Sequence, residues 1–179
     1  ANCSTTASVT LIAPTPVTFT TITTPVLCSG DSNGIITVNL GPGINDNPNY
    51  TYEITAGPAT RPVQPSNVFK GLPAGNYTVK VNSGRGCSTS APNVIVGSPT
   101  PLAATSSITT KLTCGTGNVA QPATVTVVAT PGTGTAPYKY SFDGGVNYSS
   151  TNTYQTYAGT AFDVYVKDTN GCFVILTNG

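Results

Sequence analysis

One pattern occurs twice in this sequence and constrains the fold more than any other feature. It is a run in which every second residue is apolar, followed by a glycine-containing turn and a cysteine. The turns lead to Cys87 in the first copy and, 85 positions later without a gap, to Cys172 in the second. Apolar residues at alternate positions are typical of a β-strand with one buried face. Two such units at a fixed spacing predict tandem modules. The alternating residues are Tyr77, Val79 and Val81 in the first copy and Phe162, Val164 and Val166 in the second.

The fold class follows from the way turn-forming residues are distributed. The chain has 19 glycines and 15 prolines among 179 residues, and they interrupt it too often for helices of ordinary length. Several short alternating runs separated by turn signals are typical of immunoglobulin-like sandwiches. The sequence therefore predicts an all-β protein of tandem immunoglobulin-like β-sandwich modules with a period of about 85 residues.

The same period predicts the domain boundaries. Residues 1–13 are expected to be the closing strand of a preceding module, because Asn2–Thr5 resembles Gly86–Thr89. The proline pairs in 14–16 and 99–101 are expected to be stiff connectors. Residues 17–98 form the first predicted repeat and 102–179 the second, whose last strand is expected to be short. Predicted strands lie at 17–22, 36–40, 50–54, 77–81, 93–96, 162–166 and 173–176, and 57–67 is predicted to be an irregular link.

Composition excludes several classes of function. Charged residues make up 7% of the chain and the net charge is +1, so there is no electrostatic footprint for nucleic acid or an anionic membrane. No window is apolar enough for membrane insertion. Because the chain contains no methionine, we expect a processed product or a part of something longer.

The cysteines fall into two phases, and their pairing is open. Cys28 and Cys114 lie near the start of the predicted modules, whereas Cys3, Cys87 and Cys172 lie near module ends. The favoured scheme joins Cys28 to Cys87 and Cys114 to Cys172, and gives Cys3 an upstream partner. A rival scheme joins Cys3 to Cys28 and Cys87 to Cys114 across the connectors. Disulfides in either scheme imply an oxidising, extracellular setting.

The first predicted module resembles a known repeat. It contains Gly30–Val38 after a cysteine, then the Tyr50–Tyr52 strand, then Phe69–Val81 and a Gly-Cys pair. This succession resembles the SprB-type repeat of large surface adhesins from gliding Bacteroidetes-type bacteria. The second module keeps the pattern only in its later part, at Pro137–Ser141 and Val166–Cys172. The resemblance implies secretion by the type IX route, cell-surface display, and a role in adhesion or gliding motility as a filament segment.

Catalytic and metal sites have little support in the sequence. There is no histidine and only one glutamate, Glu53, so an acid–base pair or a Cys-His nucleophile cannot be assembled. We expect no enzyme activity, no cofactor and no zinc site. Asp31 and Asp168 offer oxygens to Ca²⁺, although each also suits a simple turn. Tyr165 lies on the outward phase of its strand and is a candidate for a sugar or protein contact.

Two functions from different classes follow. The first is a structural and adhesive segment of an extracellular bacterial surface filament, whose partners are neighbouring repeats or copies of itself. The second is an accessory carbohydrate-binding module of a secreted enzyme, with surface glycans as partners. Residues 1–13 of one copy completing the short second module of the next would build such a filament by strand donation. The favoured alternative is that this chain is a slice of one long repetitive polypeptide.

Overall fold

The computed structural model describes residues 3–9, 16–42 and 49–177. Within these ranges the protein is all-β, and its helical content is one 3-10 turn, Thr116–Asn118. None of the described residues forms a helix that is long and apolar enough to cross a bilayer. Residues 1–2 and 10–15 of the predicted closing strand and connector lie outside the described residues, and residues 3–9 form no strand. The chain forms two compact units, Ala1–Thr23 with Ile36–Phe69 and Asn76–Ile95, and Thr24–Ile35 with Lys70–Gly75 and Val96–Gly179.

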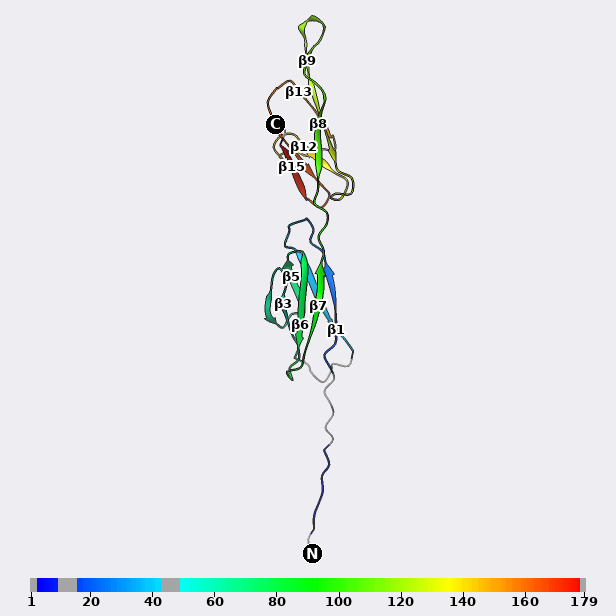
Figure 1. Ribbon diagram of the computed structural model, residues 1–179, viewed down its shortest axis with the longest axis vertical. Coiled ribbons are helices and arrows are strands. Elements are labelled where there is room, and N and C mark those ends of the chain that lie inside the picture. The colour runs from blue at the N-terminus through cyan, green and yellow to red at the C-terminus, as the bar shows by residue number, and fades with distance from the viewer. Residues whose placement is uncertain (1–2, 10–15, 43–48, 178–179) are drawn as a thin grey trace. The chain divides into compact units, whose positions relative to one another are not determined.

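The first seven strands form a two-layered sandwich, which we call the first sandwich (Figure 1). One sheet has the order β1-β2-β5 and the other has the order β4-β3-β6-β7. Their bounds are β1 Phe19–Thr24, β2 Gly34–Leu40, β3 Thr51–Ala56, β4 Arg61–Gln64, β5 Val68–Leu72, β6 Gly75–Asn82 and β7 Ser88–Val96.

Alternating side chains from both sheets form the core of the first sandwich. In β6, Tyr77, Val79 and Val81 are all 1% exposed or less, as the period-2 pattern predicts. The facing sheet contributes Ile36 and Val38 from β2. The other buried apolar residues of this sandwich are Val17, Val26, Tyr52, Ile54, Phe69, Leu72, Val94 and Val96.

The remaining strands form the second sandwich. Its sheets have the orders β13-β11-β8 and β12-β14-β15. Their bounds are β8 Ala104–Thr110, β11 Ala123–Ala129, β12 Lys139–Ser141, β13 Thr153–Thr156, β14 Asp163–Lys167 and β15 Phe173–Thr177. The pair β9 Thr113–Cys114 and β10 Ala120–Gln121 forms a separate hairpin beyond the end of β8 (Figure 1). The core is Leu102, Val125, Val127, Val164 and Val166, flanked by half-buried aromatic residues.

The two sandwiches share one strand plan. The sheet β1-β2-β5 corresponds to β8-β11-β13, and β3-β6-β7 corresponds to β12-β14-β15. A sheet of first, second and fifth strands facing a sheet that contains the third strand and the last two is immunoglobulin-like. The predicted fold class is therefore confirmed. The 85-residue period and the module boundaries stay predictions.

An asparagine pair recurs at the same place in both sandwiches. Asn67 donates from Nδ2 to the carbonyl of Val38 at 2.8 Å, and the amide of Val38 donates to the carbonyl of Asn67 at 2.9 Å. Asn152 and Val127 exchange the same two bonds, both at 2.9 Å. Each asparagine thus adds one more pair of hydrogen bonds to the sheet. It does so just before the strand that follows it, β5 or β13, begins. We call these two residues the asparagine clamps.

The link predicted to be irregular at 57–67 contains a strand. Residues Arg61–Gln64 form β4, which pairs with β3 in antiparallel register and includes Pro62. Proline cannot donate to a ladder and is confined to sheet edges. β4 is the edge strand of its sheet, so one side of it needs no donor and the proline is tolerated.

Candidate functional site

A disulfide joins two connections that are distant in sequence. Cys28, in the β1–β2 connection, bonds to Cys172, in the β14–β15 turn, with an S–S distance of 2.08 Å and a Cα–Cα distance of 5.5 Å. Both residues belong to the second compact unit. The structure differs here from the favoured scheme, which joined Cys28 to Cys87 and Cys114 to Cys172. Cys3, Cys87 and Cys114 carry free thiols, and the upstream partner of Cys3 stays a prediction.

The strand plan explains why Cys28 does not reach Cys87. Cys87 directly precedes β7, whereas Gly97 directly follows it. The amide of Val26, two residues before Cys28, donates to the carbonyl of Gly97 at 3.0 Å. Cys28 and Cys87 therefore lie at opposite ends of a nine-residue strand, roughly 30 Å at 3.3 Å per residue. A disulfide needs Cα atoms within about 7 Å.

The same argument separates Cys114 from Cys172. The β14–β15 turn bonds to the β11–β12 connection, since the amide of Thr169 donates to the carbonyl of Thr135 at 3.0 Å. That connection also holds the start of β8, because the amide of Ala103 donates to Thr133 Oγ1 at 3.1 Å. Cys114 lies past the far end of β8. Apolar periodicity does not report at which end a loop lies, so the sequence pairs cysteines that the topology separates.

The two calcium candidates are engaged in turn hydrogen bonds. Asp31 Oδ2 accepts from the amide of Cys28 at 3.3 Å and from Asn33 Nδ2 at 3.1 Å. Asp168 is buried, and its two oxygens accept from the amides of Cys172 and Thr135, both at 2.9 Å. Each aspartate thus orders the segment of a disulfide cysteine. Among residues 3–9, 16–42 and 49–177 there is no cluster of three or more metal-ligating acidic, cysteine or histidine side chains.

Tyr165 lies on the outer face of β14, as predicted, but it is half-buried. A loop that follows β12 covers one side of its ring, and a methyl group at Gly145 would lie 3.2 Å from Tyr165 Cδ1. Lys167, two residues further along β14, places Nζ 5.6 Å from the centroid of the Tyr148 ring. Burial, then the neighbouring Tyr165, raises the pKa of Tyr148.

The strand beside β14 extends this surface with apolar side chains. Phe173 is 62% exposed and pairs with Lys167, and Ile175 is 43% exposed and pairs with Tyr165. Together, Tyr148, Tyr165, Lys167, Phe173 and Ile175 form what we call the aromatic face. An aromatic surface with a cation beside it is suited to stacking contacts. The outward phase of Tyr165 predicts that this residue belongs to the aromatic face. Phe173 and Ile175 are recognised as members only from the register in which β15 pairs with β14.

Sequence reasoning missed the loop that holds Tyr148 in place. Asp143 accepts hydrogen bonds from Ser141 Oγ at 2.6 Å, from Asn147 Nδ2 at 2.7 Å and from the amides of Val146 and Asn147. The Ser141 hydroxyl, followed by the Asn147 donors, lowers the pKa of Asp143 to about 2. Asp143-Gly144-Gly145 with an asparagine at position 147 is turn chemistry that the sequence displays.

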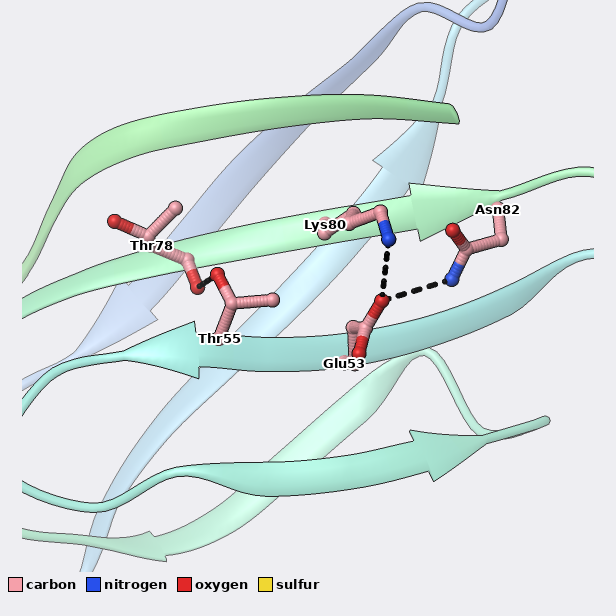
Figure 2. Close-up of polar contacts among 5 residues, drawn as sticks. All are labelled: Glu53, Thr55, Thr78, Lys80 and Asn82. Carbon is pink, nitrogen blue, oxygen red and sulfur yellow. Dashed lines mark hydrogen bonds and ion pairs between the residues drawn. The ribbon is translucent and has the colours of Figure 1, made fainter. Parts of the chain in front are cut away.

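On the outer face of the β3–β6 pair of the first sandwich, polar side chains contact one another. Figure 2 shows Glu53 of β3 in contact with Lys80 and Asn82 of β6. Glu53 Oε1 lies 3.0 Å from Lys80 Nζ and accepts from Asn82 Nδ2 at 3.1 Å. These bonds lower the pKa of Glu53. On the same two strands Thr55 Oγ1 donates to the carbonyl of Thr78 at 3.4 Å. This face therefore offers few free groups to a ligand.

The second sandwich has a surface cavity of about 550 Å³ at the end where β8 leaves the sheet. Its lining is apolar and hydroxylic, with Ile108, Leu112 and Phe162 as its large side chains. Lys111 is the one charged residue among those that line it. An acid–base pair needs two titratable groups with different roles, so this lining does not supply one.

Comparison with known proteins identifies the early part of the chain. Residues 20–59, from β1 to just past β3, match the family model of the SprB repeat. Repeats of this type are typical of cell-surface proteins. No curated protein sequence matches the chain. A solved structure, described as "Three N-terminal domains of the bacteriophage RB49 Highly Immunogenic Outer Capsid protein (Hoc)", is similar at a TM-score of 0.46 and 14% identity. That similarity covers 90% of this chain and 58% of that one.

Proposed function

We propose that this chain is a structural and adhesive segment of an extracellular bacterial surface filament built from immunoglobulin-like repeats. The observation that carries the proposal is a SprB repeat within the first of two sandwiches that share one strand plan. Repetition of one sandwich along a chain is an economical way to build length. Type IX secretion and gliding motility belong to this proposal through the resemblance to SprB-type adhesins.

The surface chemistry supports a spacer more than an enzyme. Charged residues are 7% of the chain, and Glu53 on the β3–β6 pair bonds to Lys80 and Asn82 of the same pair. Such a surface has little tendency to attract nucleic acid or anionic lipid. That the chain has no catalytic role and no cofactor is part of this proposal.

Immunogold electron microscopy of intact, unpermeabilised source cells tests this proposal, with antibodies raised against the 179-residue chain. We expect label on filaments that project from the cell surface, at repeated intervals along each filament. Pre-absorbing the antibody with the purified chain is the control and should remove the label. Intact cells without surface label, from which the antibody detects the chain only after lysis or only in the medium, would contradict the proposal.

The aromatic face favours a second function, carbohydrate binding. Tyr165, Phe173 and Ile175 lie on the outer side of β14 and β15 beside Lys167. Aromatic rings that are fixed from behind can stack on the apolar faces of sugars. The Asp143 loop fixes Tyr148 beside this surface.

A glycan array compares wild type with Tyr165→Ala and Phe173→Ala. If the aromatic face binds sugar, both variants lose binding. Ile95→Ala is a matched control, because Ile95 is 62% exposed on β7, the corresponding strand of the first sandwich. Equal binding by all four proteins, or binding by none, would leave the filament segment as the function.

A further inference from the structure

We propose that Cys87 and Cys114 are cross-linking sites for further copies of this chain, with Cys114 of one copy forming a disulfide with Cys87 of the next. The proposal deepens the filament function and rests on it for its setting. It assigns a role to two thiols that the structure leaves free. It rests on the structural equivalence of Cys87 with Cys172 and of Cys114 with Cys28. Cys28 and Cys172 are the two cysteines that are bonded.

The turns that hold Cys87 and Cys172 have the same hydrogen-bond pattern. In the first sandwich the amide of Ser83 donates to the carbonyl of Cys87 at 2.8 Å, and the amide of Gly86 to that of Ser83 at 3.0 Å. In the second sandwich the corresponding bonds, from Asp168 to Cys172 and from Gly171 to Asp168, are 2.9 and 3.1 Å. Both glycines have positive φ, +86° and +90°. Cys87 is thus presented by the same turn that presents the bonded Cys172.

The connections that hold Cys28 and Cys114 are also equivalent. Cys28 lies between β1 and β2, the first two strands of the sheet β1-β2-β5. Cys114 lies between β8 and β11, the first two strands of the corresponding sheet β8-β11-β13. The existing bond therefore joins the first connection of one sandwich to the last turn of the sandwich that follows it in the chain.

Applying this relation once more identifies the missing partners. By this relation, the disulfide partner of Cys114 lies in the last turn of a sandwich that follows the second sandwich. The partner of Cys87 lies in the first connection of a sandwich that precedes the first sandwich. A second copy of the chain supplies both. Within the 179 residues neither cysteine can use its counterpart, because Cys28 and Cys172 already bond to each other.

Both thiols are available for this reaction. Cys114 is exposed and Cys87 is half-buried. The turn of Cys87 also contains Ser83, 7% exposed, whose hydroxyl has no hydrogen-bond partner among the described residues. Buried hydroxyls are usually satisfied, so the turn of Cys87 carries one unsatisfied polar group.

The oxidant in this scheme is a low-molecular-weight disulfide such as glutathione disulfide. The Cys114 thiolate attacks one of its sulfurs, forms a mixed disulfide and releases one glutathione thiolate. The Cys87 thiolate of the second copy then attacks the Cys114 sulfur and releases the second glutathione. The two cysteine thiols lose two protons and two electrons, and the glutathione disulfide gains both to become two thiols.

The experiment uses two full-length variants that cannot polymerise. Both carry Cys3→Ser, which removes the third free thiol. The first also carries Cys87→Ser and keeps Cys114, whereas the second also carries Cys114→Ser and keeps Cys87. They are mixed in a glutathione redox buffer, and products are separated by non-reducing electrophoresis and mapped by mass spectrometry.

We expect a disulfide-linked heterodimer of twice the 18.1 kDa chain mass, with Cys114 bonded to Cys87, and little homodimer from either variant alone. In a matched control, the first variant is replaced by one that carries Cys3→Ser, Cys87→Ser and Cys114→Ser. This control variant gains a thiol at another position through Tyr157→Cys. Tyr157 is 65% exposed in the same sandwich, so its product measures chance collision.

The internal Cys28–Cys172 peptide shows in every tube that the buffer is oxidising. Homodimers as abundant as the heterodimer, an equal yield from the Tyr157→Cys control, or no heterodimer while Cys28–Cys172 forms would each overturn the proposal. None of these results alters the immunogold expectation, so the filament function and the cross-link fail separately.

Discussion

At the scale of single residues, the carboxylate of Asp143 shows how a short loop gains a fixed shape. Four donor groups from Ser141, Val146 and Asn147 point to its two oxygens. Hydrogen bonds to the charged form favour ionisation, and the pKa of Asp143 is accordingly about 2 rather than 3.8. Because the folded pKa is depressed, the contribution of Asp143 to stability is fully present above pH 3.8. It is lost as pH falls from 3.8 through 2.

Carbon-detected NMR titration of the side-chain carboxyls checks this expectation. Asp143 should titrate with a midpoint near 2, and Ser141→Ala should raise its pKa towards 3.8 because the largest cause of the shift is removed. Asn147→Ala removes the Nδ2 donor, which is a smaller cause of the shift than the Ser141 hydroxyl, and should raise the pKa by less. Val146→Ala keeps its backbone amide and serves as the control. A midpoint near 3.8 in the wild type would contradict the hydrogen bonding described.

Residue chemistry is also where sequence reasoning reached its limit. The outward phase of β14 predicts Tyr165 as a surface residue, and the structure confirms its face. Its cover by the Asp143 loop depends on how Gly145 approaches the ring, which alternation does not encode. The cysteine phases correctly separate Cys28 and Cys114 from the others, but bond formation depends on which ends of the sandwiches the loops occupy.

At the scale of elements, strands whose apolar residues alternate were the most predictable. β6 and β14 appear where the period-2 pattern places them, with their alternate valines buried. β4 was missed because Pro62 argues against a strand, and only its place at a sheet edge makes that proline harmless. Edge position is a property of the assembled sheet, so no local pattern reports it.

The asparagine clamps give an element-scale prediction. Asn152→Ala removes the bond from Nδ2 to the carbonyl of Val127, and one such bond contributes about 1 kcal/mol. We expect Asn152→Ala to lower the free energy of unfolding of the second sandwich by about 1 to 2 kcal/mol, including the cost of an unsatisfied carbonyl. Asn67→Ala should do the same in the first sandwich. Urea denaturation monitored by NMR signals from each sandwich measures both.

Ser150→Ala is the control for the clamps, since Ser150 is exposed and lies two residues before Asn152. It should leave the free energy of unfolding within about 0.5 kcal/mol of wild type. If Asn152→Ala behaves like this control, the clamp is not a stabilising element.

At the scale of the whole molecule, the two sandwiches differ in the size of their cores. Among the described residues, 13 apolar side chains are buried in the first sandwich and five in the second. Burying one such side chain contributes roughly 1.5 to 3 kcal/mol before the entropic cost of folding. The second sandwich is therefore expected to open at a lower free energy than the first.

Hydrogen exchange monitored by mass spectrometry tests this difference. Amides of β11 and β14 should exchange through openings of lower free energy than amides of β2 and β6, and their protection should disappear at lower urea concentration. The comparison is made within one chain, so solvent and temperature are matched. Loss of protection in all four strands at one urea concentration would show that the sandwiches unfold together.

The bond between Cys28 and Cys172 has a mechanical consequence. It connects residues separated by 144 positions, so tension applied at the two ends of the chain passes from one sulfur to the other. The polypeptide between them carries almost none of that load. Most strands of both sandwiches lie in this sheltered stretch, whereas β1 and β15 lie outside it and carry the load. Reducing the bond would return the full length of chain to the path of the force.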